Sequence, residues 1–129
     1  FFNVSFVGTQ ALANELGKEA RGVVISQVMP SPFSTSTAIS REYVEAVRKA
    51  GGDAKPNYSS MEGYVAAKVF AEGLKRAGKP ATRDSLIAGL ESMQNTDFGG
   101  FHVDFSARDH KASNYVELSM LTEDGKVRR

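Results

Sequence analysis

The stretch that decides the fold is Ser59-Ser60-Met61-Glu62-Gly63-Tyr64-Val65-Ala66-Ala67, and its pattern continues to Leu74. Apolar and small residues occupy almost every side of the helix that this pattern predicts, so we expect a long helix that is largely buried. Its N-terminal cap is predicted to be Ser59 or Ser60, whose hydroxyl groups can accept a hydrogen bond from the first turn. Gly78-Lys79-Pro80 predicts its end, because neither glycine nor proline continues a helix well.

The residues after this helix predict a second helix and then two strands. Thr82 is expected to cap the second helix. Further on, the apolar period changes from helical to two, so the Gly99-Gly100 turn is followed by a predicted strand over 101–105 and another over 115–120. Asp124-Gly125 predicts a hairpin-type turn before a short tail.

The residues before the long helix predict a strand, a short helix and a second strand. Phe1 to Val7 is rich in aromatic and β-branched residues and predicts a buried strand. Thr9 is expected to cap a helix over residues 10–16. Gly22 to Met29 contains a nearly continuous apolar run, which is typical of a parallel strand covered on both faces. Because the connection is short, we predict that the two strands are adjacent and parallel, in a fold of the α/β class.

A stiff linker and another helix lie between these strands and the long helix. The prolines of Pro30-Ser31-Pro32-Phe33-Ser34 disfavour helix and predict an extended segment. Apolar residues at helical spacing over residues 36–50 predict an amphipathic helix, which Gly51-Gly52 ends.

The composition is that of a globular protein and points to no charged partner. The chain has 129 residues and a formal net charge of +1, so we expect no nucleic-acid partner and no membrane affinity from charge alone. The basic residues within 126–129 are expected to form a solvated tail. There is no cysteine, which excludes disulfides, thiol catalysis and cysteine-based zinc sites. No apolar run reaches the roughly 20 residues that a membrane-spanning helix needs.

The sequence lacks the patterns that carry catalysis or bind a cofactor. It has no glycine-rich phosphate-binding pattern and no serine in a nucleophile elbow. The spacing of His102 and His110 is a weak signal for a metal site, and Asp104 and Asp109 are expected to lie on the surface. We therefore expect no enzyme activity, no cofactor and no metal, and predict a binding function instead.

Two segments of the sequence lie where a ligand would bind. In open α/β sheets, ligands bind beyond the carboxyl ends of parallel strands, and Gly8-Thr9-Gln10 is the first such position. The second is Tyr58-Ser59-Ser60-Met61, before the long helix. A helix N-terminus offers unpaired N–H groups and a partial positive charge, which suit an anionic group. The alternative interpretation is that Thr9 and Ser59 only cap their helices and that Tyr58 only packs.

Several short segments, each unspecific alone, occur in an order and spacing that is specific in combination. They are Phe6-Val7-Gly8, the strand from Gly22 to Pro30, Arg41-Glu42-Tyr43, Glu62-Gly63-Tyr64-Val65-Ala66-Ala67, Arg76-Ala77-Gly78 and Gly99-Gly100-Phe101. In this order they resemble the branched-chain amino-acid-binding family of periplasmic solute-binding proteins, which serve ABC importers. The resemblance covers nearly the whole chain. It implies the type-1 periplasmic-binding fold, with two doubly wound lobes, three crossover strands and a ligand in the cleft.

The resemblance implies that the chain is a C-terminal portion with pieces of both lobes. Residues 1–29 would belong to the second lobe, 30–35 to a crossover and 36–96 to the first lobe. Residues 97–129 would cross back near Phe98 to Phe101 and return to the second lobe. The resemblance also implies a periplasmic location, with a signal peptide outside this sequence, and two partners: a small-molecule ligand and the membrane permease of an ABC importer. The implied mechanism is hinge closure of the lobes on the ligand.

The resemblance also implies which residues face the ligand. These are Thr9 and Gln10 from one lobe and the segment from Tyr58 to Met61 from the other. In amino-acid-binding members, the loop after the first of these strands supplies a carboxylate to the ligand ammonium, and Gln10 stands at the matching position here. A buried ammonium without its counter-charge costs about 3–5 kcal/mol, by analogy with broken buried ion pairs. This departure favours an amide, an aromatic or other carboxylate, or another small organic solute over an α-amino acid.

Two other functions remain open at this stage. One is a ligand-sensing regulatory domain of the same fold without a transport role, and the other is an α/β enzyme, which would need a titratable cluster in a cleft. For the chain by itself we expect an intertwined, domain-swapped or tightly packed oligomer. It would be held through the apolar faces of the strand Gly22–Met29 and the helix Met61–Ala77, because exposed strand edges and faces invite pairing with another chain.

Overall fold

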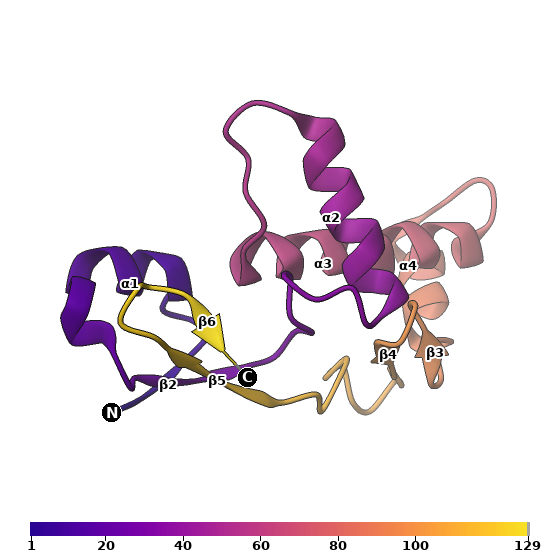
Figure 1. Cartoon of the computed structure of the whole chain (residues 1–129). Coiled ribbons are helices and arrows are strands. Elements are labelled where there is room, and N and C mark those ends of the chain that lie inside the picture. The colour runs from indigo at the N-terminus through magenta and orange to yellow at the C-terminus, as the bar shows by residue number, and fades with distance from the viewer. Residues whose placement is uncertain (129) are drawn as a thin grey trace.

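The chain folds into two bodies that two extended segments join (Figure 1). The computed structural model describes residues 1–128. In chain order the elements are β1 (Phe2–Val4), α1 (Thr9–Leu16), the 3-10 turn η1 (Gly17–Ala20), β2 (Val24–Gln27), α2 (Ala38–Ala50), α3 (Tyr58–Ala77), α4 (Arg83–Glu91), β3 (Thr96–Asp97), β4 (His102–Val103), β5 (Glu117–Leu121) and β6 (Val127–Arg128). We call the body with α1 and the four-stranded sheet β1-β2-β5-β6 the sheet body. The body with α2, α3, α4 and the β3–β4 hairpin is the helical body.

The sheet body contains the predicted strand–helix–strand unit. β1 and β2 are adjacent and parallel, with Phe2 opposite Val24, and α1 connects them. β5 pairs antiparallel with β2, and β6 pairs antiparallel with β5 across the predicted Asp124-Gly125 turn. The parallel pair and the turn are therefore confirmed. Lys126 and Arg128 are exposed, as expected, but Val127–Arg128 extend the sheet as β6 and do not form a separate tail. Arg129 lies outside the described residues.

One face of this sheet is covered and the other is open. α1 and η1 lie over the covered face (Figure 1), and the core there consists of Ala13, Ala20, Val23, Ile25 and Leu121. Strand pairing places the side chains of the opposite face in rows, of which Phe2, Val24 and Met120 form one. We call this the open sheet face and define it by its exposed apolar members, Phe2, Val4, Leu118 and Met120.

The open sheet face corrects two predictions about burial. Phe2 is 85% exposed and Leu118 is 59% exposed, although both stand in strands. A buried strand over residues 1–7 is therefore wrong for this chain. The strand from Gly22 to Met29 is not covered on both faces either, because Val24 and Ser26 are only half-buried and Val28 is 39% exposed. The physical reason is that, within residues 1–128, helices cover only one face of the sheet, the face on which α1 lies.

The helical body is held by α3, on which α4 packs at close range. A methyl group placed on Gly89 would lie 2.6 Å from the backbone oxygen of Gly73, so the two helices approach each other through glycine. Thr82 caps α4 as predicted, in a capping box in which the Ser85 N–H donates to Thr82 Oγ1 at 3.1 Å. The core of this body consists of Ile39, Tyr43, Met61, Val65, Met93, Phe98, Phe101 and Val103.

The predicted glycine turn also serves the start of α2. Gly99 and Gly100 have φ angles of 84° and 92°, which favour glycine, and the Ile39 N–H donates to the Gly99 carbonyl at 3.0 Å. The turn is confirmed. Phe98 and Phe101 pack in the core of the helical body, and the position of the return crossing between lobes stays a prediction.

The long helix α3 differs from its prediction in its N-cap and in its burial, whereas its end at Ala77, with Gly78 as C-cap, is as predicted. Its N-cap is Asn57, so the predicted cap at Ser59 or Ser60 is wrong. Phe70 is 51% exposed and Leu74 is 39% exposed, so the helix is buried along one side rather than around its girth. Within residues 1–128, no helix combines the length and the hydropathy needed to cross a membrane.

Candidate functional site

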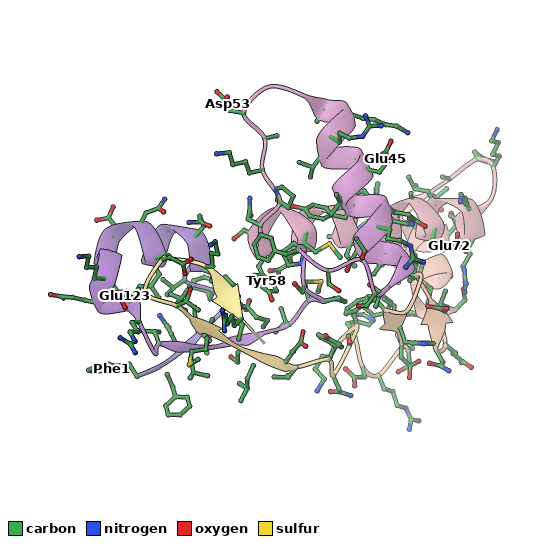
Figure 2. All side chains as sticks on the ribbon, viewed as in Figure 1. Phe1, Glu45, Asp53, Tyr58, Glu72 and Glu123 are labelled. Carbon is green, nitrogen blue, oxygen red and sulfur yellow. The ribbon has the colours of Figure 1, made fainter. Side chains whose placement is uncertain are left out.

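The first turns of α1 and α3 meet where the two bodies adjoin. A methyl group placed on Gly8, at the start of α1, would come 3.6 Å from Oγ of Ser59 in the first turn of α3. Figure 2 shows Tyr58 at this junction, where α3 begins. The two segments that the sequence predicts as ligand positions therefore lie side by side, although they belong to different bodies.

The start of α1 is held by the sheet rather than by a helix cap. Gly8 is the N-cap and has no side chain, while Oγ1 of Thr9 accepts a hydrogen bond from Nε2 of the buried Gln27 at 3.0 Å. The same nitrogen donates to Oγ of Ser119 at 2.9 Å, so the start of α1 is tied to both β2 and β5. The predicted cap at Thr9 is therefore wrong, because β2 engages its hydroxyl group. The N–H groups of this turn have no side-chain cap.

Gln10 presents a neutral amide at the first turn of α1. Its side chain is exposed, and its Nε2 donates to Oδ1 of Asn14 at 3.0 Å, one turn further along the helix. No acidic residue stands in this first turn. The positive end of the helix dipole is therefore not neutralised from within the turn, which favours an acceptor or an anion there.

The first turn of α3 is capped, but the N–H group of Ser59 remains outside the helical hydrogen bonding. Oδ1 of Asn57 accepts the Ser60 N–H at 2.9 Å, and the Asn57 carbonyl accepts the Met61 N–H at 3.0 Å. The N–H group of Ser59 has no partner inside the helix, as is usual in the first turn of a helix. Of the predicted side chains, Ser59 is exposed, whereas Met61 is fully buried in the core of the helical body.

An aromatic pair lies beside this turn. Tyr58 is only 5% exposed, and its ring meets that of Phe33 edge-on at a centroid distance of 6.0 Å. Phe33 comes from the segment that connects β2 to α2 and is 51% exposed. The junction therefore combines backbone N–H groups with apolar ring surface, which are the two elements of a site for a small organic solute.

Sequence reasoning missed three residues that hold this junction. Gln27 is an amide inside an apolar strand, and that is a usable signal, because buried polar groups need partners. Asn57 directly before the helix is as strong a capping signal as the serines that follow it. Tyr43 gives no local signal, because only the packing of α2 against α3 brings its hydroxyl to Ser60.

The clearest pKa shifts lie away from the junction. Arg48 holds the pKa of the Glu45 carboxyl below its ordinary value by hydrogen bonding to it on the surface of α2. Lys126 and then Thr122 lower the pKa of Asp124 to about 2 in the turn between β5 and β6. Neither carboxylate can supply acid–base chemistry at the junction. The helix starts, hydroxyls and rings there are suited to binding a polar solute rather than to moving protons.

Comparison with known proteins identifies a family for nearly the whole chain. A family model described as periplasmic binding protein matches residues 1–126. No curated protein matches the chain.

Solved structures with a similar fold include three at or above 30% identity. A substrate-binding periplasmic protein from Ralstonia solanacearum is 34% identical over 98% of this chain, with a TM-score of 0.87. A possible leucine/isoleucine/valine-binding protein from Rhodopirellula baltica is 31% identical over 99% of it, with a TM-score of 0.92. An extracellular ligand-binding receptor from Verminephrobacter eiseniae is 30% identical over 99%, with a TM-score of 0.82. The chain spans 36%, 34% and 37% of these proteins, respectively.

Proposed function

Since the chain belongs to the periplasmic binding protein family, we propose that the whole protein is the solute-binding component of an ABC importer and works outside the cytoplasm. The type-1 periplasmic-binding fold predicted from the sequence is confirmed for the part of the fold that the chain spans. The observation that carries the proposal is the meeting of two helix starts at Gly8 and Ser59. Because these starts belong to different bodies, a small solute bound beside their contact would be held by both bodies.

In this proposal the sheet body is part of the second lobe and the helical body is part of the first. The extended segments between them would be crossovers about which the lobes swing. A ligand that touches both lobes binds the closed arrangement more tightly than the open one, and this difference in affinity drives closure. The closed form would then present its surface to the membrane permease.

The proposed solute carries a hydrogen-bond acceptor, such as a carboxylate or an amide, and lacks an α-ammonium group. Two helix starts offer unpaired N–H groups and the positive ends of their dipoles at the junction. The first turns of α1 and α3 contain no acidic residue, so an ammonium group near Gln10 would lack a counter-charge. The rings of Tyr58 and Phe33 would contact the hydrocarbon part of the solute.

Thermal unfolding of the full-length receptor tests this solute class. Leucine and 4-methylpentanoate form a matched pair, because they differ only in the α-ammonium group, and benzoate and benzamide extend the series to aromatic compounds. A ligand at about 100 times its Kd stabilises the folded state by roughly 2.7 kcal/mol. We expect at least one of the three compounds without an ammonium to raise the Tm more than leucine does. A larger shift with leucine, or an α-amino acid found by mass spectrometry in the purified receptor, would contradict the proposed class.

The chain of 129 residues by itself is expected to self-associate. The open sheet face is one apolar surface, and a groove of about 640 Å³ along α3 is another, with Val65, Phe70 and Val116 among its lining residues. Burial of apolar surface stabilises by roughly 25 cal/mol per Å², so both surfaces favour a tightly packed or domain-swapped oligomer. Sedimentation at micromolar concentration should therefore show a species larger than the monomer.

Two lysine substitutions locate the contact in this self-associated form. Leu118→Lys places a charge on the open sheet face and should shift the chain toward the monomer. Leu16→Lys is the matched control, because Leu16 is also partly exposed but lies on α1, on the other side of the sheet. A wild-type chain that sediments as a monomer with well-dispersed amide signals would refute the expectation.

A further inference from the structure

The buried hydroxyl of Tyr43 is directed at the start of α3. Tyr43 lies in α2 and is 2% exposed. Its hydroxyl oxygen accepts the Asn57 N–H at 2.9 Å, lies 2.5 Å from Oγ of Ser60 and lies 3.2 Å from the Asn57 carbonyl oxygen. One side chain from a neighbouring helix therefore touches both the N-cap residue of α3 and the third residue of its first turn.

These contacts close into a consistent ring of hydrogen bonds. Each hydroxyl carries one hydrogen, so Tyr43 can donate to Ser60 while it accepts from the Asn57 N–H. The Ser60 hydroxyl then donates to the Asn57 carbonyl at 3.3 Å. In this arrangement the buried hydroxyl of Tyr43 is satisfied as donor and as acceptor.

The segment that leads into α3 has little else to hold it. Gly51 and Gly52 have φ angles of 69° and 63°, and residues 53–57 form no helix or strand. A cavity of about 550 Å³ lies between this segment and the helices, with Asp53, Lys55 and Tyr64 among its lining residues. Within residues 1–128, the hydrogen bonds that join residues 51–57 to α2 all end on the Tyr43 hydroxyl.

We propose that Tyr43 is a positioning residue for the solute site, and that its hydroxyl fixes the direction of the first turn of α3. The N–H group of Ser59 can reach a ligand at the junction only if that turn is held, because the segment before it is attached by this hydroxyl. The inference rests on the proposed function, since it assigns Tyr43 to the same junction. The ring of Tyr43 has a separate role in the core, where it packs edge-on against Tyr64 at 5.7 Å.

The test removes the hydroxyl and leaves the ring in the full-length receptor. Tyr43→Phe should raise the hydrogen–deuterium exchange rate of the Asn57, Ser60 and Met61 amides about tenfold or more in the ligand-free protein, because their turn is released. Its Kd for 4-methylpentanoate should rise about tenfold. Tyr64→Phe is the matched control, because it changes the same ring pair and should leave both measurements at wild-type values.

If Tyr43→Phe affects folding, Ser60→Ala alone tests the same ring, and it should also raise the exchange rate of the Asn57 amide, because it removes one link of the ring. Ser60→Ala removes the other hydroxyl of the ring, and the double variant should exchange no faster than Tyr43→Phe alone, since both changes break one network. Unchanged exchange in Tyr43→Phe would overturn the inference. So would faster exchange with an unchanged Kd for 4-methylpentanoate. If the wild-type receptor does not bind 4-methylpentanoate, the proposal of that solute is refuted. The hydrogen–deuterium exchange rates alone then decide whether Tyr43 holds the first turn of α3.

Discussion

Replacement of Gln10 by glutamate should reverse the preference of the full-length receptor between leucine and 4-methylpentanoate. Gln10 stands in the first turn of α1, is exposed at the junction and carries no charge. In the proposed site, the leucine ammonium would be taken from water without a counter-charge, at about 3–5 kcal/mol by analogy with broken buried ion pairs. Micromolar binding corresponds to about 8 kcal/mol in total, so this term decides whether leucine binds at all.

The glutamate variant supplies the missing charge at the same position. Leucine should then bind at least tenfold more tightly than to the wild type, and 4-methylpentanoate more weakly, because two carboxylates would repel each other. Isothermal titration calorimetry of each ligand with each protein measures the four Kd values and shows whether the preference reverses. Gln10→Met is the control, because it keeps the length of the side chain but adds no charge, and it should not improve leucine binding. Tight leucine binding by the wild type would show that Gln10 does not exclude an ammonium.

The second large effect concerns the contact between α3 and α4. In Gly89→Ala, the added methyl group would lie 2.6 Å from the Gly73 carbonyl oxygen and 3.0 Å from the Ala77 nitrogen. Both atoms are backbone, so the helices have to move apart, and such overpacking typically destabilises by about 1–3 kcal/mol. The Tm of the full-length protein should fall by several degrees.

Gly63→Ala is the matched control for this substitution. Gly63 lies in the interior of α3, is exposed, and a methyl group there meets nothing within 4 Å. Alanine restricts the unfolded chain more than glycine does and should stabilise the helix by about 0.5–1 kcal/mol. The same chemical change is thus expected to have opposite signs at positions 63 and 89. Equal effects at the two positions would mean that α3 and α4 do not pack as closely as the structure shows.

Helix caps illustrate how far local sequence reasoning reaches. Thr82 caps α4 as predicted, because its partner Ser85 lies within the same turn and no other group competes for the hydroxyl. At Thr9 the same rule fails, because Gln27 on a neighbouring strand takes the hydroxyl. At Ser60 it fails because Asn57 caps the helix and Tyr43 holds the serine. A cap is predictable when its competitors are close in sequence and unpredictable when they come from other elements.

The candidate site likewise has a part that the sequence predicts and a part that only the packing decides. Thr9, Gln10 and the segment from Tyr58 were predicted from the rule that ligands bind at the carboxyl ends of strands and at helix starts, and they remain predicted ligand residues. Their meeting at the junction could not be derived, because the separation of Gly8 from Ser59 depends on how two bodies pack. The roles of Gln27 and Tyr43 depend on the same packing.

The sequence by itself determined the order of the elements, the parallel pairing of β1 and β2, and the glycine turns. Apolar periodicity and turn chemistry act over a few residues, so they are encoded locally. Only the tertiary structure decided which apolar surfaces are covered. Val116, Leu118 and Met120 alternate as a buried strand should, yet they are exposed, while Ser119 between them is buried against Gln27. Alternation of apolar and polar residues indicates that the two faces of a strand differ. Which of the two faces is buried depends on the element that packs on the sheet.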